Sequence, residues 1–319
     1  MPNLDTIEYA NQITCIDTHY QRPELAACYL VESEGEAVFI DTGTSHTVPR
    51  LMEILAMKGI APSQVKYVIP THVHLDHAGG AGELIRRLPN ASLVIHPYGA
   101  KHMIDPSKLI AGATAVYGED QFEKQFGKLT AVPEERVIEA PDDTRISFGS
   151  RELLILDTPG HARHHFCIYD GVSEAIFSGD TFGLSYREFD TEQGHFIMPT
   201  TTPVQFDPEA WLTTLERLMT LSPQRIYLTH FGEIGDVVEM AEQLSRYIED
   251  FATIARACNT PPGEQRVAEI RNRLKDWMMQ KLLTHGCNLP RETIEQRMAM
   301  DLLLDAQGLD VWLSRLEKA

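Results

Sequence analysis

The stretch Thr71-His72-Val73-His74-Leu75-Asp76-His77 decides how this chain is interpreted, because it offers four potential metal ligands within six residues. Neutral imidazole and carboxylate are suitable ligands for zinc and for first-row metals such as iron and manganese. His72 and His74 are two residues apart, so in an extended segment they project to the same side. The chain then turns toward a predicted helix, and the turn lets Asp76 and His77 point elsewhere and serve a second ion.

Three more candidate ligands follow later in the chain, each in a short motif: His161 in Thr158-Pro159-Gly160-His161, Asp180 in Ser178-Gly179-Asp180-Thr181, and His230 in Leu228-Thr229-His230. Nearly all of the candidates lie at or just after an apolar, strand-like run, as an active site on one rim of a sheet requires. A lone histidine is usually an ordinary surface or core residue. This clustering, with too many ligands for one tetrahedral ion, favours metal-dependent hydrolysis at two ions that share a bridging carboxylate.

In these motifs the sequence resembles the metallo-β-lactamase-fold hydrolases, and among them the glyoxalase II-like branch. The resemblance rests on His72-x-His74-x-Asp76-His77 followed by His161, Asp180 and His230, and spans roughly residues 10 to 235. Asp41-Thr42-Gly43 also fits the family, in which this turn supports the metal site. The resemblance implies an α/β fold, namely an αββα sandwich with metals on its open edge. It says less about the substrate, because this fold hosts many reactions.

The resemblance also implies roles for the ligands. One metal would take His72, His74 and His161, the other would take Asp76, His77 and His230, and Asp180 would bridge them. We expect two divalent ions, with zinc favoured over iron or manganese, and a metal-bridging hydroxide that attacks the substrate. Catalytic roles are assigned to Asp76, which can also pass a proton to the leaving group, and to Asp180. Further candidates for contact with the metal site or the substrate are Asp41, His164, His165 and Tyr186.

Composition limits the partners. The chain has 28 basic and 46 acidic residues and a net charge of -18, which disfavours nucleic acid because phosphate binding needs basic patches. We expect a small-molecule substrate. We see no secretory signal and no apolar run near the roughly 20 residues that span a bilayer, so no membrane role is expected. Five widely spaced cysteines suit free thiols in a reducing compartment, which predicts a cytoplasmic protein.

The predicted organisation is a catalytic domain over residues 1–232 and a helical C-terminal subdomain over 233–319. Strands are predicted at 12–16, 28–31, 37–40, 67–69, 93–95, 153–157, 165–169 and 175–178, and helices at 48–57 and 80–88. Residues 97–137 are too long for a plain connection and are predicted to form a helical insertion near the site.

The tail shows helical periodicity. Apolar residues recur at helical spacing at Val237, Met240, Leu244, Ile248 and Phe251, and Pro261-Pro262-Gly263 breaks the run. An apolar face within 290–319, which includes Met298, Leu302 and Leu303, can cover the site, pack on the core or form a homodimer, and we favour the homodimer.

The substrate is less well defined than the ligands. After Asp180 the chain reads Thr181-Phe182-Gly183-Leu184-Ser185-Tyr186-Arg187, where glyoxalase II carries a Cys-Gly-Arg-type segment, and this departure argues against glutathione thioesters. Lactonases of the family often carry tyrosine at the position of Gly183, so the glycine here argues against a lactonase as well. We expect hydrolysis of a small-molecule ester or thioester, with a phosphodiesterase or lactonase as the alternative.

Two alternatives belong to other classes. A mono-iron sulfur dioxygenase shares this fold but lacks the second-metal set, so the presence of Asp76, His77 and His230 argues against it. A metal-binding effector protein without turnover is the other alternative, and the intact ligand set does not distinguish it from an enzyme.

Overall fold

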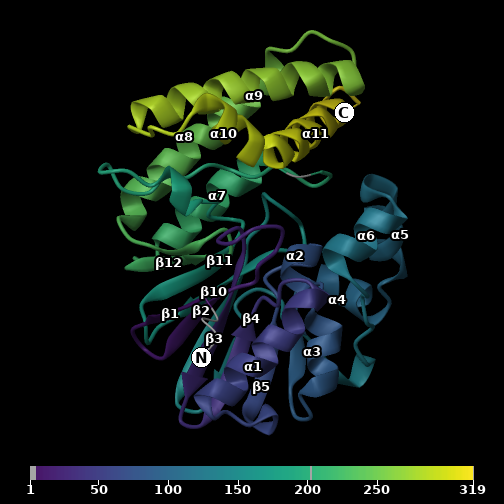
Figure 1. Ribbon diagram of the computed structural model, residues 1–319, viewed down its shortest axis with the longest axis vertical. Coiled ribbons are helices and arrows are strands. Elements are labelled where there is room, and N and C mark those ends of the chain that lie inside the picture. Colours follow the sequence, from purple (N-terminus) through teal and green to yellow (C-terminus); the bar gives the residue numbers. More distant parts are fainter. Residues whose placement is uncertain (1–4, 202, 319) are drawn as a thin grey trace. The chain divides into compact units, whose positions relative to one another are not determined.

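The structure is a computed structural model that describes residues 5–201 and 203–318 (Figure 1). The chain divides into two compact units. The first comprises the described part of Met1–Asp157 with His164–Gly179 and Gln224–Glu233, and the second comprises the described parts of Thr158–Arg163, Asp180–Pro223 and Ile234–Ala319. The second unit therefore combines the predicted C-terminal helices with residues 158–163 and 180–223, which the sequence interpretation places in the 1–232 domain.

Two mixed sheets follow one another along the chain. The first has the spatial order of its sequence, with antiparallel pairing as far as β4 and parallel pairing from β4 to β7. Its strands are β1 (Thr6–Tyr9), β2 (Ile13–Asp17), β3 (Ala27–Ser33), β4 (Glu36–Ile40), β5 (Val65–Ile69), β6 (Ser92–Ile95) and β7 (Val137–Glu139).

The second sheet has the order β13-β12-β11-β10-β9-β8, and its β11–β12 pair is parallel. Its strands are β8 (Arg145–Phe148), β9 (Arg151–Asp157), β10 (Phe166–Asp170), β11 (Ala175–Gly179), β12 (Arg225–Leu228) and β13 (Gly232–Ile234). Parallel neighbours end at the same edge of a sheet. Ile40 of β4 is opposite Ile69 of β5, and Gly179 of β11 is opposite Leu228 of β12, so the loops that leave these strands emerge together within each sheet.

Alternation along the strands explains why both faces of the first sheet are buried. In β3, Tyr29 and Val31 join a core shared with residues of the second sheet such as Phe177, while Cys28 and Leu30 point to the other face. Successive side chains of a strand point to opposite faces, so a strand covered on both sides has a continuous apolar sequence. The two sheets therefore pack face to face.

Helices of the first unit cover the outer face of the first sheet through apolar residues such as Leu51, Leu84 and Met103. These helices are α1 (Val48–Lys58), α2 (Leu75–Ala78), α3 (Ala81–Arg87), α4 (Pro97–Ile104), α5 (Ser107–Tyr117) and α6 (Glu119–Phe126). The last three lie in residues 97–137, where helices were predicted. Phe122 and Phe126 of α6 and Leu109 of α5 form a small apolar cluster with Leu75 of α2.

The second unit is built around helices, and Figure 1 shows α9 lying along α11. They are α7 (Pro208–Met219), α8 (Val237–Arg256), α9 (Glu264–Thr284), α10 (Arg291–Arg297) and α11 (Ala299–Leu316). The five apolar positions predicted to share one face of α8 are all buried. Met298 and Leu302 are also buried within the single chain. No helix of the described residues is long and apolar enough to cross a membrane.

The core between the sheets gives a stability prediction. Phe177 is buried, with its ring centroid 5.2 Å from that of Tyr29 and 4.9 Å from that of Tyr227. Phe177→Ala should lower the free energy of unfolding by about 3–5 kcal/mol, because it removes apolar contacts and leaves a cavity. Denaturant unfolding measures this. Val172→Ala, at an exposed position near β11, is the control and should change stability by about 0.5 kcal/mol or less; equal losses would contradict the packing described.

Candidate metal-binding site

The ligand loop begins where β5 ends and leads into the short helix α2, which carries Asp76 and His77. Its backbone is fixed at several points within the first unit. The Thr71 N–H donates to Asp41 Oδ1 at 2.7 Å, and the Thr71 carbonyl accepts from Phe166 N–H at 3.0 Å. The His77 N–H donates to the carbonyl of His74 at 3.1 Å. The turn into α2 places Asp76 and His77 on the helix that follows His72 and His74, and the ring centroids of His72 and His77 lie 4.1 Å apart.

Asp41 is the fully buried centre of this hydrogen-bond network. Its Oδ2 accepts from His77 Nδ1 at 2.9 Å and from Thr229 Oγ1 at 2.6 Å. Its Oδ1 accepts from the Thr71 N–H and, at 3.0 Å, from the Thr71 hydroxyl. One carboxylate thus joins the turn after β4, the ligand loop after β5 and the loop after β12.

Asp76, His77 and His230 form a group of potential ligands whose ligand atoms all lie within 4.8 Å of one another. His77 Nε2 is 3.8 Å and His230 Nε2 is 3.5 Å from Asp76 Oδ2. His230 Nδ1 donates to the carbonyl of Leu25 at 2.7 Å. Since a carbonyl oxygen only accepts, the proton of His230 lies on Nδ1, and Nε2 carries the lone pair that a metal needs. The hydrogen bond to Asp41 orients His77 in the same way.

His72 and His74 form a second pair in the first unit, with His72 Nε2 and His74 Nδ1 2.8 Å apart. Two further imidazoles lie beside them. The His165 ring is stacked 4.8 Å from that of His72, and the His164 ring lies 5.7 Å from that of His74. The first unit therefore brings His164 and His165, two of the further candidates, to its ligand loop.

In the second unit, His161 and Asp180 lie together, with His161 Nε2 3.4 Å from Asp180 Oδ2. His161 is buried, and its Nδ1 donates to the carbonyl of Thr200 at 2.9 Å. This bond fixes the tautomer that presents Nε2 to Asp180, by the same rule that applies to His230. Three histidines, from loops far apart in the sequence, thus each use Nδ1 for support and leave Nε2 for a ligand bond.

Tyr186 has a different setting in the second unit. Its hydroxyl donates to Asp301 Oδ1 of α11 at 2.9 Å, and the side chain is buried. Tyr186 thus links the segment after Asp180 to the C-terminal helix.

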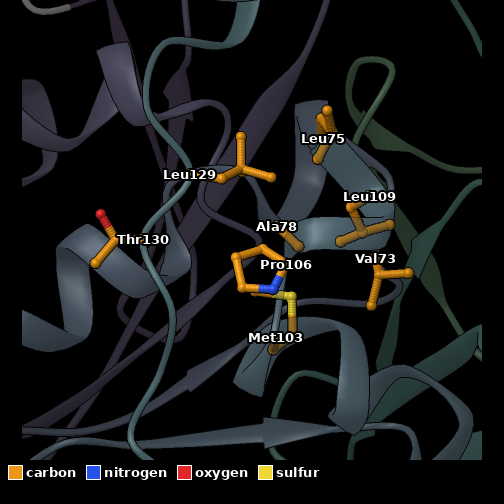
Figure 2. Close-up of a pocket in the computed structure, with 9 residues that line it drawn as sticks. Val73, Leu75, Ala78, Met103, Pro106, Leu109, Leu129 and Thr130 are labelled. Atoms are coloured by element: carbon orange, nitrogen blue, oxygen red, sulfur yellow. The ribbon is translucent and has the colours of Figure 1, made fainter. Parts of the chain in front are cut away.

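The far side of the ligand loop packs against the helical insertion. The residues that alternate with the ligands, Val73 and Leu75, line a small apolar pocket together with Met103, Pro106 and Leu109 of the α4–α5 region (Figure 2). Val73 lies between His72 and His74, and successive residues of an extended segment face opposite ways, so Val73 points away from these two candidate ligands. The 97–137 insertion therefore supports the loop from behind.

The sequence matches the model of a known protein family. The model of the metallo-beta-lactamase superfamily matches residues 22–230. The chain belongs to the metallo-beta-lactamase superfamily. It is 26% identical over 229 residues to the metallo-beta-lactamase fold-containing protein ST1585 of Sulfurisphaera tokodaii, a match that covers 71% of this chain and 80% of that protein. The ST1585 crystal structure superposes with a TM-score of 0.64 at 21% identity, over 94% of this chain and 99% of the other. The predicted α/β sandwich fold is thereby confirmed.

Relatives with enzyme names are similar over shorter stretches. The acyl-coenzyme A thioesterase MBLAC2 of Bos taurus is 26% identical over 179 residues, which cover 50% of this chain and 60% of that protein. A hydroxyacylglutathione hydrolase-like protein of Gallus gallus is 32% identical over 160 residues, covering 48% and 43% respectively. These matches include the glyoxalase II-like proteins that the motif order resembles. With its His/Asp groups that could hold a metal ion, the protein is a metal-dependent hydrolase of this superfamily.

Of the groups that support the candidate ligands, the sequence indicated Asp41. The acceptors for His161 and His230 are backbone carbonyls, those of Thr200 and Leu25, and every residue has a carbonyl, so no residue type marks them. Thr229, which donates to Asp41, was also missed, although a hydroxyl directly before the candidate ligand His230 is a signal that the sequence offered.

The buried carboxylate gives a prediction about metal affinity. Asp41→Asn replaces one acceptor oxygen by an amide that donates, and so loses the support of His77. We expect the affinity for a divalent ion to fall about 10- to 100-fold, as is typical when a partner of a ligating histidine is removed. Chelator competition measures the affinity. Asp170→Asn is the control, since Asp170 is equally buried but contacts Ser173 and Arg151. Wild-type affinity in the Asp41 variant would refute this role.

Gly179, which directly precedes Asp180, gives a second prediction. Its φ is +51°, and a Cβ there would lie 2.6 Å from both His165 Nε2 and Thr71 Oγ1. Gly179→Ala should therefore displace the ligand loop and lower the free energy of unfolding by about 1–3 kcal/mol. Thermal unfolding and metal titration test this. Gly171→Ala is the matched control because the nearest atom to its Cβ would be 3.9 Å away; a harmless Gly179→Ala substitution would contradict the crowding.

Proposed function

We propose that the protein is a binuclear hydrolase that cleaves an ester or thioester bond of a small molecule. The observation that carries the proposal is the common orientation of His77, His161 and His230, each of which uses Nδ1 for a supporting hydrogen bond. A histidine held in this way is prepared to bind a metal through Nε2.

The first proposed ion is held by Asp76, His77 and His230. The donor set fits, since one carboxylate and two imidazoles are ligands that a divalent ion such as zinc accepts. His77 is fully buried, whereas the side chain of Asp76 is 23% exposed. Asp76 therefore faces the more accessible side of the group, where a carboxylate can also accept and return a proton during the reaction.

The second proposed ion would be held by His72, His74 and His161, and Asp180 would serve both ions. Covalent connectivity supports this grouping. His161 lies in a segment of six residues, Thr158–Arg163, whose ends continue into the first unit, and Asp180 directly follows Gly179 of β11. The order and spacing of the motif match the superfamily pattern. When bound, such an ion pair lowers the pKa of a shared water and polarises the substrate carbonyl.

Nitrogen and oxygen ligands also bear on which metal is bound. The two groups of potential ligands among the described residues contain histidine and aspartate. Zinc, iron and manganese all accept such ligands, and zinc is our first choice because it binds imidazole well in four-coordinate sites.

The substrate class rests on relatives and on one departure. Among the enzyme-named relatives, one is an acyl-coenzyme A thioesterase and one is a hydroxyacylglutathione hydrolase-like protein. The segment Phe182–Arg187 differs from that of glyoxalase II, and Tyr186 within it is bonded to Asp301. We therefore favour an acyl thioester or ester other than a glutathione conjugate.

The proposal predicts a joint loss of metal and activity. Wild-type protein should contain close to two ions per chain by elemental analysis and should hydrolyse at least one member of a panel of acyl-coenzyme A thioesters and aryl esters. His72→Ala and Asp180→Ala should each lose bound metal and lower kcat/KM by at least about 1,000-fold, because both remove a ligand. His19→Ala is the control, since this exposed histidine pairs with Asp5.

Other results would point elsewhere. Hydrolysis confined to lactones or phosphodiesters on the same panel would change the substrate class but keep the metal centre. A single iron with persulfide-dependent oxygen uptake would favour a dioxygenase. Full metal content in both ligand variants would refute the ligand assignment, and two ions without turnover would favour an effector protein.

A further inference from the structure

The peptide bond between Thr200 and Thr201 is held from both sides within the second unit. Its carbonyl oxygen accepts from His161 Nδ1 at 2.9 Å. Its N–H donates to Asp305 Oδ1 of α11 at 2.6 Å. Because the carbonyl and the N–H belong to one planar peptide unit, rotation of either group rotates the other. The orientation of the carbonyl that supports His161 therefore depends on the acceptor at Asp305.

The segment that contains this peptide is anchored nearby as well. Met198 pairs with Leu184 through two backbone hydrogen bonds of 2.9 and 3.0 Å, and Leu184 lies four residues after Asp180. The Thr201 hydroxyl donates to the Asp305 carbonyl at 3.1 Å. The segment 198–201 is thus connected to the Asp180 loop, to His161 and to α11.

Helix α11 contributes two carboxyl groups to this region, one turn apart. Asp301 accepts from the Tyr186 hydroxyl, and Asp305 accepts from Thr201. Asp305 is 1% exposed and Asp301 is half-buried, and the partners Tyr186 and Thr201 are buried. A helix that only covered apolar surface would not need two inward-facing carboxyl groups, since each costs free energy to bury unless it is hydrogen-bonded.

We propose that Asp305 is a positioning residue for the metal centre, which orients the Thr200–Thr201 peptide and thereby directs Nε2 of His161 toward the metal. This inference rests on the proposed function, because it concerns one of the proposed ligands. It assigns to the C-terminal helix a part in metal binding. Hydrogen bonds arranged in series also polarise one another, so the acceptor at Asp305 strengthens the bond that the carbonyl makes with His161.

The environment of Asp305 suggests what substitution it tolerates. Burial raises the pKa of the Asp305 carboxyl well above its ordinary value, and Asp301 raises it further, while the hydrogen bonds from Thr201 lower it. A raised pKa favours the uncharged form. The position then requires an acceptor oxygen of the right reach rather than a negative charge, and asparagine provides one.

The test compares Asp305→Asn with Asp305→Leu, which keeps the volume but removes the acceptor. Metal-free protein is titrated with Co²⁺ while the ligand-field absorption is recorded, and the affinity for Zn²⁺ is measured by chelator competition. Asp305→Leu should weaken one of the two ions about tenfold, the lower end for partners of a ligand, and change the absorption of that site. Asp305→Asn should stay within about twofold of wild type.

A control separates positioning from general damage to the tail. Asp310→Asn, on the same helix, breaks the ion pair with Arg266, whose Nε lies 2.5 Å from Asp310 Oδ1. It should lower thermal stability but leave both metal affinities unchanged. If Asp305→Leu does not fold, Thr201→Val removes the hydroxyl that donates to Asp305 and should produce a smaller loss of the same kind.

The proposal is overturned if Asp305→Leu binds both ions like wild type, if Asp305→Asn loses as much affinity as Asp305→Leu, or if Asp310→Asn loses it equally. Failure of the proposed function is a separate result, since wild-type protein would then bind neither ion. In that case, nuclear magnetic resonance of the metal-free protein tests the positioning role by itself. The Nδ1 proton of His161 should be hydrogen-bonded in wild type and in Asp305→Asn but not in Asp305→Leu. An unchanged signal in Asp305→Leu would overturn the inference.

Discussion

The buried carboxylate of Asp41 is the constraint on which the first unit depends. From the turn after β4 it accepts hydrogen bonds from Thr71 of the ligand loop, His77 of α2 and Thr229 of the loop after β12. A carboxylate without such donors would be costly to bury, so the loops must converge for the fold to be stable. The same convergence places His77 beside Asp76. It also places His230 there, because His230 directly follows Thr229. The interaction that satisfies a buried charge therefore also assembles a group of potential ligands.

The candidate histidines illustrate how a neutral acceptor can orient an imidazole ring. The His161 and His230 rings each donate to a backbone carbonyl, which is neutral and rigidly held by the chain. A carbonyl fixes the tautomer without adding a negative charge to a site already rich in carboxylates. His77 alone uses a carboxylate, Asp41, and that group is satisfied by threonine donors. Each ring is thus oriented before a metal binds, which reduces the entropy lost on binding.

The sequence predicts the strands and helices that have a clear period. The buried strands β2 to β6 and β9 to β11 correspond to apolar runs, and the buried face of α8 follows the predicted positions. The strands that were not predicted, such as β1 and β7, are half exposed and mixed in composition. They pair at sheet edges, where the neighbouring strand rather than the local sequence determines their conformation. The candidate ligands stand out in the sequence because their chemistry is specific. That residues 180–223 belong to the same compact unit as the tail depends on contacts distant in sequence, which no local pattern marks.

Two buried aspartates show what periodicity could not predict in the C-terminal helix α11. Asp41 and Asp305 are equally hidden, yet Asp41 is surrounded by several donors and Asp305 by the few that Thr201 supplies. Apolar residues at helical spacing, such as Leu302, Leu309 and Leu313, mark the buried face of α11, so the buried Asp305 interrupts that face. In the folded chain the interruption is where the helix contacts the peptide that supports His161. A polar residue at an apolar position of a helix is therefore informative, because burying it requires a specific partner that fixes the register of the contact.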